Sequence, residues 1–526
     1  MDKSLQISSF FSPSVKIKPI VTALESPPLL FRIPKSGKRI PRHPASSGTS
    51  EFRLTYKGNF SMLHPQKDEF LSNQLSTQEV TMKSLRILTI IVCFFLVSAC
   101  ALYASDTGVL RVGAAKADIT PPDSFFPFGS PARPGSIPRG GFVGVHDRIY
   151  VRAIVIDNGS TQAAIVTFDL GGLTSPEEIS KKIGAAIGVS TDRIFIAATH
   201  NHCAPGIGPM GPTQEVDPKI AKFREVVEKG MIEAVRQAKA KLQPARMGFG
   251  RGNAYINANR DQKVGDSYVL GYNPDGPSEK VVDVLKFESL SGEPIAFLIN
   301  YAVHAVVMFA AITKDGGTEV TGDIPGVTSR YVEAYYKDKP VALWTSGAAG
   351  DQNPVYMATH IVPEWTDLGA PAYVLLEEQS RRLGEEVVRV SDQIKADASE
   401  VTIWGRKTSA TCPGGRVTRV PNSNEVKTQD ADPVELKLQA LRLNDVALAG
   451  VNGEVVSVIG QHMKKDSPLT KTIFITHTSG TVGYIPDDAS YPKVTFEVTG
   501  SRLKPGCSEN TIVDGLVRLI KTSISN

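Results

Sequence analysis

The sequence predicts an α/β protein with a mostly parallel or mixed central sheet flanked by helices. From residue 149 onward, apolar runs with strand character alternate with longer segments that have helical character. This alternation is typical of α/β domains. Polar side chains also follow several of the predicted strands directly. Because ligands of such sheets bind beyond the carboxyl ends of the strands, we expect the functional site at that edge.

The individual elements follow from apolar runs and from helix-start signals. The helix that begins near Ser175 has a capping residue, a proline at its first position and two acids in its first turn, all of which favour a helix N-terminus. The expected strands cover residues 149–156, 162–170, 193–199, 294–303, 341–346 and 446–451. Further helices are expected over residues 218–242, 324–336, 373–394 and 510–524, and after Glu454.

Residues 82–104 have the pattern of a secretory signal peptide. A positively charged segment with Lys83 and Arg86 precedes the apolar run 87–97, and small residues follow this run. The run is short for a membrane-spanning helix. Two forms of an exported protein remain open. Cys100 can be the lipidated residue of a lipobox, which gives a membrane-anchored lipoprotein, or cleavage near Ala104 gives a free periplasmic or secreted protein.

Residues 1–81 are rich in Ser, Pro and Lys and show no apolar period. We expect them to be disordered or to be an extension in front of a true start at Met82. Residues 105–526 are long enough for a sizeable core. The net charge of the chain is +4, and the positive excess lies in residues 1–104. Nothing in the remainder therefore indicates a nucleic-acid partner.

Three cysteines remain after residue 104, namely Cys203, Cys412 and Cys507. Three cysteines do not form a disulfide framework. A bridge between Cys412 and Cys507 is compatible with an oxidising compartment, but the sequence leaves it undecided.

Two histidines lie two residues apart directly after the strand that starts at residue 193. His200 and His202 share one face if the strand continues, and imidazole is the commonest metal ligand in proteins. The alternative is a pair of histidines that caps backbone groups in a loop. If the pair binds a metal, the protein is expected to be a hydrolase.

Three further polar residues follow predicted strands in the same topological position. They are His304, Asp351 and Glu454. Alone, His304 could be a hydrogen-bonded core histidine. A carboxylate at the exit of an apolar strand costs desolvation energy unless it is paired or bound to a metal. The shared position of these residues with His200 therefore predicts a metal centre.

From about residue 110 to 520 the chain resembles the N-terminal catalytic domain of the neutral/alkaline non-lysosomal ceramidases. The segments that carry the resemblance are VGAAKADITPP at 112–122, THNHCAPG at 199–206, NYAVH at 300–304, GEVVSV at 453–458, and YIP at 484–486 with Tyr491. The resemblance implies that residues 105–526 form the catalytic domain.

The resemblance implies a catalytic Zn²⁺ held by His200, His304, Glu454 and Tyr484. It also implies that His202 is an acid/base or substrate-orienting group beside the metal rather than the second ligand. Two histidines, a glutamate and an open position form a familiar catalytic zinc shell.

On the substrate side the resemblance is less complete. The segment NANR at 257–260 makes Arg260 a candidate substrate contact, with a surface-loop arginine as the alternative. A serine that the family uses falls on Asn353, and a family tyrosine falls on Phe496. Asn353 can donate a hydrogen bond but cannot act as a nucleophile, and Phe496 offers no donor.

Together these features imply an exported zinc-dependent hydrolase that cleaves the amide bond of an N-acyl, ceramide-like lipid by attack of a zinc-activated water. The expected partner is thus an amphipathic lipid, with surface attachment if Cys100 is lipidated. One alternative is a zinc hydrolase of a different amide or ester. Another is a non-catalytic binding protein on the same scaffold. The sequence leaves the oligomeric state open.

Overall fold

The computed structural model describes residues 107–128, 141–208, 217–314, 317–360, 369–419 and 426–525. The expected signal peptide with Cys100, and residues 1–81, lie outside these ranges.

The larger of two main sheets has eight strands in the order β13-β11-β10-β7-β2-β4-β5-β6. Its pairs are antiparallel except β5–β6 and β11–β13, which are parallel. The predicted mixed α/β architecture is therefore confirmed. The strands are β2 (Arg111–Asp118), β4 (Tyr150–Asp157), β5 (Gln162–Phe168), β6 (Ile194–Ala198), β7 (Gln243–Asn253), β10 (Val281–Ser289), β11 (Pro294–Tyr301) and β13 (Val341–Ser346).

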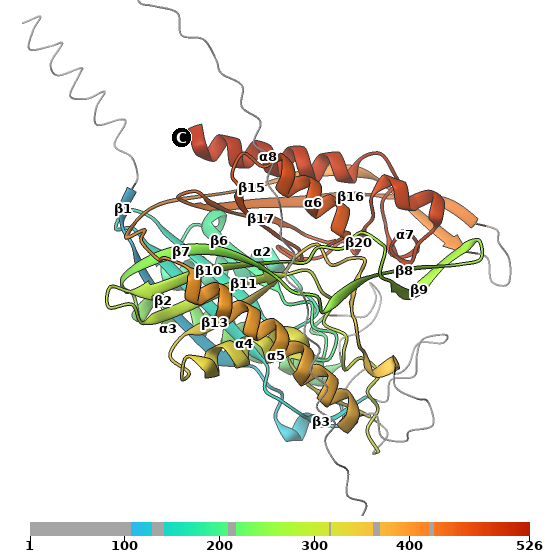
Figure 1. The fold of residues 1–526 in the computed structure, drawn as a ribbon, viewed down its shortest axis with the longest axis horizontal. Helices are drawn as coiled ribbons and strands as arrows, with labels where there is room; N and C mark the ends of the chain where they lie inside the picture. The colour runs from blue at the N-terminus through green and yellow to red at the C-terminus, as the bar shows by residue number, and fades with distance from the viewer. Residues whose placement is uncertain are drawn as a thin grey trace, which may run out of the picture. The chain divides into compact units, whose positions relative to one another are not determined.

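A second sheet of five strands packs against one face of the first (Figure 1). Alternate residues of both sheets, such as Ile154 and Leu298 in one and Leu441 and Leu448 in the other, form one buried apolar cluster between them. The strands, in the order β1-β15-β16-β17-β19, are β1 (Thr107–Val109), β15 (Glu400–Arg419), β16 (Val426–Leu443), β17 (Val446–Val451) and β19 (Lys471–Ile475).

Helices cover the outer faces of both sheets, which gives a helix–sheet–sheet–helix order of layers. Helices α2 (Pro176–Ile187) and α3 (Pro218–Ala240) pack on β4, β5 and β6, while α4 (Asp323–Tyr335) and α5 (Gly369–Gln393) pack on β10, β11 and β13. Helices α6 (Ser457–Asp466) and α8 (Ser508–Ser525) cover the five-stranded sheet. None of the helices within the described ranges is both long and apolar enough to cross a bilayer.

The predicted elements agree with the observed ones to within a few residues. Strands β7 and β10 of the first sheet were not predicted, nor was the second sheet apart from β17. Its long hairpin β15–β16 has a mixed exposure pattern and a bulge between Cys412 and Gly414. Period-2 alternation, the usual strand signal, is therefore interrupted there. The shorter elements are β3 (Phe142–Val145), β8 (Asn257–Val264), β9 (Ser267–Asn273), β12 (Thr318–Val320), β14 (Gln352–Pro354), β18 (Glu454–Val455), β20 (Tyr484–Ile485) and α7 (Phe496–Gly500).

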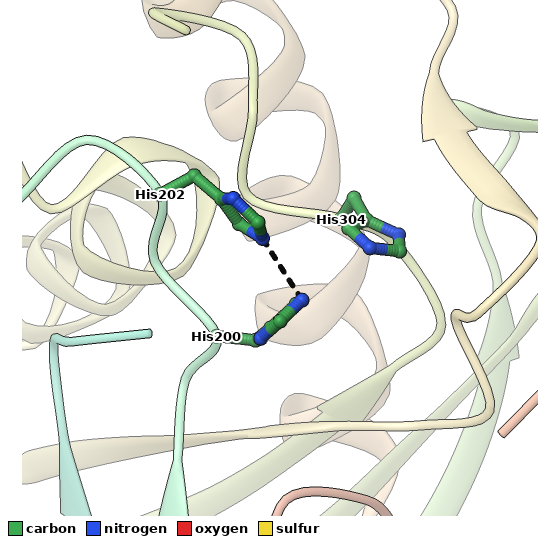
Figure 2. A group of neighbouring side chains, drawn as sticks. All are labelled: His200, His202 and His304. Carbon is green, nitrogen blue, oxygen red and sulfur yellow. Dashed lines mark hydrogen bonds between the residues drawn. The ribbon is translucent and has the colours of Figure 1, made fainter. Parts of the chain in front are cut away.

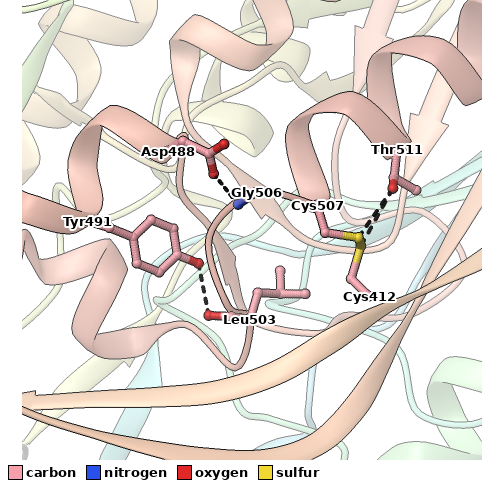
Figure 3. The surroundings of a disulfide bond; sticks show 7 residues. All are labelled: Cys412, Asp488, Tyr491, Leu503, Gly506, Cys507 and Thr511. Atoms are coloured by element: carbon pink, nitrogen blue, oxygen red, sulfur yellow. Dashed lines mark hydrogen bonds between the residues drawn. A yellow bond between two sulfur atoms is a disulfide. The ribbon is translucent and has the colours of Figure 1, made fainter.

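A disulfide joins Cys412 in β15 to Cys507 directly before α8, and so decides the question that the sequence left open (Figure 3). It links residues 95 positions apart in the chain. The segment before Cys507 is held as well, because the Tyr491 hydroxyl donates to the Leu503 carbonyl at 2.9 Å and the Gly506 amide donates to Asp488 at 2.7 Å. The disulfide therefore ties α8 to the sheet that it covers.

Candidate metal centre and active site

Loops that follow the strands of the eight-stranded sheet pair with one another and form the floor of the site. Asn201, after β6, forms a parallel bridge with Ala305, after β11. The His304 amide donates to the Gln352 carbonyl at 3.0 Å, which connects the loop after β11 to the loop after β13. Polar residues at three strand ends are thus brought to one place, as the sequence predicted.

Three histidines converge at this point (Figure 2). The ligand-type nitrogens of His200, His202 and His304 all lie within 4.8 Å of one another. The Nε2 atoms of His200 and His202 are 2.9 Å apart. His200 has a left-handed backbone conformation with φ of 60°, a strained geometry for a residue other than glycine and one that is common at functional sites.

The backbone fixes the orientation of two of these rings. His200 Nδ1 lies 3.1 Å from the Gly171 carbonyl oxygen, and His304 Nδ1 lies 3.1 Å from the Gln352 carbonyl oxygen. A carbonyl can only accept, so each Nδ1 carries the proton and each Nε2 presents a lone pair to the cluster. This arrangement is typical of metal-ligating histidines.

Glu454 completes the cluster from the second sheet. Its Oε2 atom is 3.2 Å from His200 Nε2 and 3.4 Å from His304 Nε2. Burial raises the pKa of Glu454, but the neighbouring imidazoles of His200 and His304 outweigh burial and lower that pKa well below its ordinary value. Glu454 is therefore a carboxylate at neutral pH, and its negative charge suits a cation.

Tyr484 is the register partner of Glu454. The short strands β18 and β20 pair in parallel with Glu454 opposite Tyr484, so the two side chains are neighbours. Burial raises the pKa of Tyr484 above its ordinary value, although Arg260 acts against this rise. At neutral pH the side chain is a protonated phenol, which can donate a hydrogen bond.

These donors fit a divalent metal ion. Imidazole and carboxylate ligands, with a phenol beside them, suit zinc and related ions. Two ligand sets are compatible with the geometry: the three histidines, or His200 and His304 with Glu454 and Tyr484. The distances alone do not separate them, because both His202 and Glu454 approach His200 closely.

Arg260 is buried beside the metal cluster, with only 4% of its surface exposed, so the surface-loop alternative is wrong. Its Nε donates to Glu497 at 2.8 Å and its Nη1 donates to the Asn353 side-chain oxygen at 3.1 Å. The guanidinium also lies over the rings of Tyr484 and Phe496, at 5.4 and 5.3 Å from their centroids. Arg260 Nη2 is buried with no hydrogen-bond partner among the described residues.

Asp351 follows β13 as expected, but its carboxylate bonds to residues beside the cluster of histidines and Glu454 rather than to the cluster itself. It accepts hydrogen bonds from the Ser457 amide at 2.7 Å, the Ser457 hydroxyl at 2.8 Å and the Asn259 side chain at 2.9 Å. Burial raises the pKa of Asp351 to about 6. Its contacts fix the start of α6, three residues after Glu454.

The structure adds residues that the sequence reasoning missed. The His477 ring stacks on that of His200 with centroids 3.8 Å apart; it follows the apolar strand β19, so the rule for strand ends could have found it. Glu497, which is buried, and Asp261, which is partly buried, form an acidic pair beside Arg260. Burial together with Glu497 raises the pKa of Asp261 far above its ordinary value. No local signal marks this pair.

Fold and site together define a mixed α/β protein with a histidine and carboxylate centre at its strand ends. Residues 110–361 match the family model described as neutral/alkaline non-lysosomal ceramidase, N-terminal. This match confirms the resemblance to the neutral/alkaline non-lysosomal ceramidases over these residues.

Individual relatives agree with this assignment. The chain is 26% identical over 284 residues to neutral ceramidase of Drosophila pseudoobscura pseudoobscura, a match that covers 50% of this chain and 38% of the relative. It is 27% identical over 223 residues to neutral ceramidase of Pseudomonas aeruginosa, covering 38% and 30%. The chain thus spans about a third of the length of the curated relatives it matches.

The crystal structure of neutral ceramidase from Pseudomonas aeruginosa has a similar fold, with a TM-score of 0.59 at 18% identity over 78% of this chain and 73% of that one. A ceramidase complexed with C2 gives a TM-score of 0.60, also at 18% identity, over 79% and 76%. These likenesses concern the fold.

Proposed function

We propose that the chain is an exported zinc-dependent hydrolase that cleaves the amide bond of an N-acyl, ceramide-like lipid. The observation that carries the proposal is the convergence of His200, His304 and Glu454, with both Nδ1 atoms engaged by carbonyls and both Nε2 atoms directed at the carboxylate. The match of residues 110–361 to the ceramidase family model supports the choice of substrate class.

A zinc ion bound by His200, His304, Glu454 and Tyr484 would supply a Lewis acid that polarises the amide carbonyl and makes water nucleophilic near neutral pH. The protein side chains around it then have separate tasks. Glu454 provides the negative charge that a divalent cation requires. The Gly171 and Gln352 carbonyls keep the two imidazoles neutral and in the tautomer that binds metal.

His202 is proposed as the acid/base. Its Nε2 lies beside the metal cluster, 2.9 Å from His200 Nε2, within reach of a water or of a leaving amine. In amide hydrolysis the C–N bond breaks only if the nitrogen receives a proton, and an imidazole can transfer that proton near neutral pH. Tyr484, which lies opposite Glu454 in the β18–β20 pair, is proposed to help stabilise the oxygen on which negative charge develops.

Arg260 is proposed to hold the substrate through its unpartnered Nη2 atom. Glu497 and Asn353 occupy its Nε and Nη1 atoms, which leaves a fixed donor. A lipid amide offers hydroxyl and carbonyl oxygens that can accept this hydrogen bond.

A second candidate is a hydrolase of a different amide or of an ester. It is favoured by Asn353, whose oxygen is already bonded to Arg260, and by Phe496, which has no hydroxyl group. Both positions lie on the substrate side, so the metal chemistry can be retained while the substrate changes.

Export is proposed on the signal-like residues 82–104 and on the Cys412–Cys507 disulfide. Disulfides persist in oxidising compartments and are rare in the cytosol. A Cys100→Ala variant distinguishes the two exported forms, because it should release a lipoprotein from the membrane fraction and leave a free secreted protein unchanged.

Metal analysis of the purified chain followed by a substrate screen tests the proposed activity. We expect about one zinc per chain, release of fatty acid from N-acyl sphingosine, and loss of that activity with chelator and its return with zinc. Absence of stoichiometric metal would end the proposal. Hydrolysis of simple esters or acyl amino acids in place of N-acyl sphingosine would favour the second candidate.

A further inference from the structure

His477 is a buried histidine beside the metal cluster that has no task in the proposed ligand set or in the proposed acid/base chemistry. It lies two residues after β19, in the loop 476–483 that leads to Tyr484. Only 5% of its surface is exposed, and its Nδ1 atom is buried with no hydrogen-bond partner among the described residues. A buried polar atom without a partner costs free energy, so an ordinary core position would favour an apolar side chain.

The backbone of His477 is strained as well. Its φ of 57° lies in the left-handed region, and Ser479 follows two residues later with φ of 55°. Residues other than glycine persist in this region only where the surrounding structure holds them, and they are common at functional sites. His477 therefore combines two unfavourable features for which simple core packing gives no reason.

The main chain of His477 lies between two segments that lead to residues of the metal cluster. Its carbonyl accepts a hydrogen bond from the Ala198 amide at 3.3 Å, and Ala198 ends β6 two positions before His200. Its amide donates to the Gly453 carbonyl at 3.4 Å, directly before Glu454. His477 is therefore anchored to both sheets at the point where an imidazole and the carboxylate of the cluster meet.

The ring of His477 covers one face of the His200 ring. The two centroids are 3.8 Å apart and the ring planes differ by 13°. The hydrogen bond between His200 Nδ1 and the Gly171 carbonyl holds one edge of the His200 ring, but the ring can still tilt about that bond. A parallel ring against its face opposes this motion, because tilting would break the favourable stacked arrangement.

The orientation of the His200 ring decides which neighbour its Nε2 atom approaches. That atom lies 2.9 Å from His202 Nε2 and 3.2 Å from Glu454 Oε2 (Figure 2 shows the two histidines). A small rotation toward His202 would therefore weaken the approach to the carboxylate. The stacked ring of His477 holds His200 in the orientation in which its nitrogen and the Glu454 oxygen converge.

We propose that His477 is a positioning residue of the metal site, whose ring plane fixes His200 in the orientation that binds the metal ion. The proposal rests on the part of the proposed function in which His200 is a metal ligand, and it does not depend on the choice of substrate. The flat ring carries the effect rather than Nδ1, which has no partner among the described residues. Removal of a group that orients a ligand typically lowers metal affinity about 10–100-fold.

The first experiment measures zinc affinity by competition with a chelator for three substitutions of His477. Phenylalanine keeps a flat ring without the nitrogens, leucine keeps apolar volume without a flat ring, and alanine removes both. His477→Phe should bind zinc within about threefold of the parent protein, whereas His477→Leu should bind about tenfold and His477→Ala about 10–100-fold more weakly.

His462→Ala is the matched control for loss of a histidine. His462 is exposed on α6, and its Nδ1 lies 2.6 Å from Glu509 of α8, so this variant should bind zinc as the parent protein does. Urea unfolding of the metal-free proteins verifies that each variant folds. If His477→Ala does not fold, the comparison of His477→Phe with His477→Leu decides the proposal.

The second experiment needs neither metal nor substrate. Crystal structures of the chelator-treated parent protein and of His477→Leu should show the His200 ring in one orientation in the parent, and turned toward His202 or in several orientations in the variant. An unchanged His200 ring would overturn the proposal.

The zinc affinities give two further results that would overturn it: His477→Leu binds as tightly as the parent protein, or His477→Phe binds as weakly as His477→Leu. If the parent binds zinc but hydrolyses no amide, the proposed function fails and the affinities still decide the role of His477. If the parent binds no zinc, the proposed function fails as well, and the orientation of the His200 ring in the two crystal structures decides whether His477 positions it.

Discussion

Replacing Glu454 with glutamine tests which side chains hold the metal. The substitution keeps the size of the side chain but removes the negative charge that lies 3.2 and 3.4 Å from the two imidazoles. Loss of a group that only supports a ligand already lowers metal affinity 10–100-fold. Loss of a direct ligand should therefore cost more than about 100-fold, or about 2.7 kcal/mol of binding free energy.

His202→Ala should behave in the opposite way. If His202 acts as the acid/base, its removal leaves the ligands in place and lowers the rate roughly 10²–10⁴-fold, about 2.7–5.4 kcal/mol in the barrier. Zinc affinity should fall little. The contrast between the two variants matters because His202 and Glu454 approach His200 to similar distances.

The assay is zinc content per chain after equilibration with graded concentrations of a competing chelator, measured together with circular dichroism to verify the fold. His200→Ala serves as the reference for an emptied site. If His202→Ala loses zinc as His200→Ala does while Glu454→Gln retains it, the three histidines are the ligand set and the reasoning above is refuted.

Three further predictions concern pH and stability. Burial and Glu497 raise the pKa of Asp261, so the folded state retains a proton that the unfolded state releases. The free energy of unfolding should therefore fall as the pH rises from the ordinary carboxyl pKa toward the raised one. Asp261→Asn should flatten this fall in urea unfolding, and an unchanged slope would contradict the assignment. Arg152 is buried and donates to Asp169 at 2.8 Å. Arg152→Met should lower the free energy of unfolding by about 3–5 kcal/mol, because it leaves the buried charge of Asp169 unpaired. A loss below about 1 kcal/mol would show that the Asp169 carboxyl is neutral. Cys412→Ser should lower the free energy of unfolding by about 2–5 kcal/mol, and a reductant should lower the stability of the parent protein equally and leave the variant unaffected.

The strand-end residues of the site were predictable because their signal is local. His200, His304 and Glu454 each follow an apolar run that is buried in the structure. An apolar run that ends in a titratable side chain can be found from neighbouring residues alone. That these residues lie together was then predicted from the rule that ligands of α/β sheets bind beyond the carboxyl ends of the strands.

Other parts of the site depend on contacts between distant segments. The ion pair between Arg260 and Glu497 joins residues 237 positions apart, and neither residue has neighbours that indicate a partner. Tyr484 came from the family resemblance, because a tyrosine in a two-residue strand has no periodicity of its own. The five-stranded sheet escaped prediction for a related reason, since one face of β15 and β16 packs on elements from elsewhere in the chain.

The metal cluster also requires the two sheets to be packed correctly on each other. His200 and His304 follow strands of the eight-stranded sheet, whereas Glu454 follows β17 of the five-stranded sheet. The loops meet at Gly350, whose amide donates to the Val455 carbonyl at 2.8 Å and where a Cβ would lie 2.8 Å from the Glu454 carbonyl oxygen. Such a close approach leaves no room for a side chain, so glycine is needed there. Because the carboxylate and the imidazoles come from different sheets, any shift between the sheets changes the distances between them. We therefore expect the stability of the sheet packing and the affinity for the proposed metal ion to be linked.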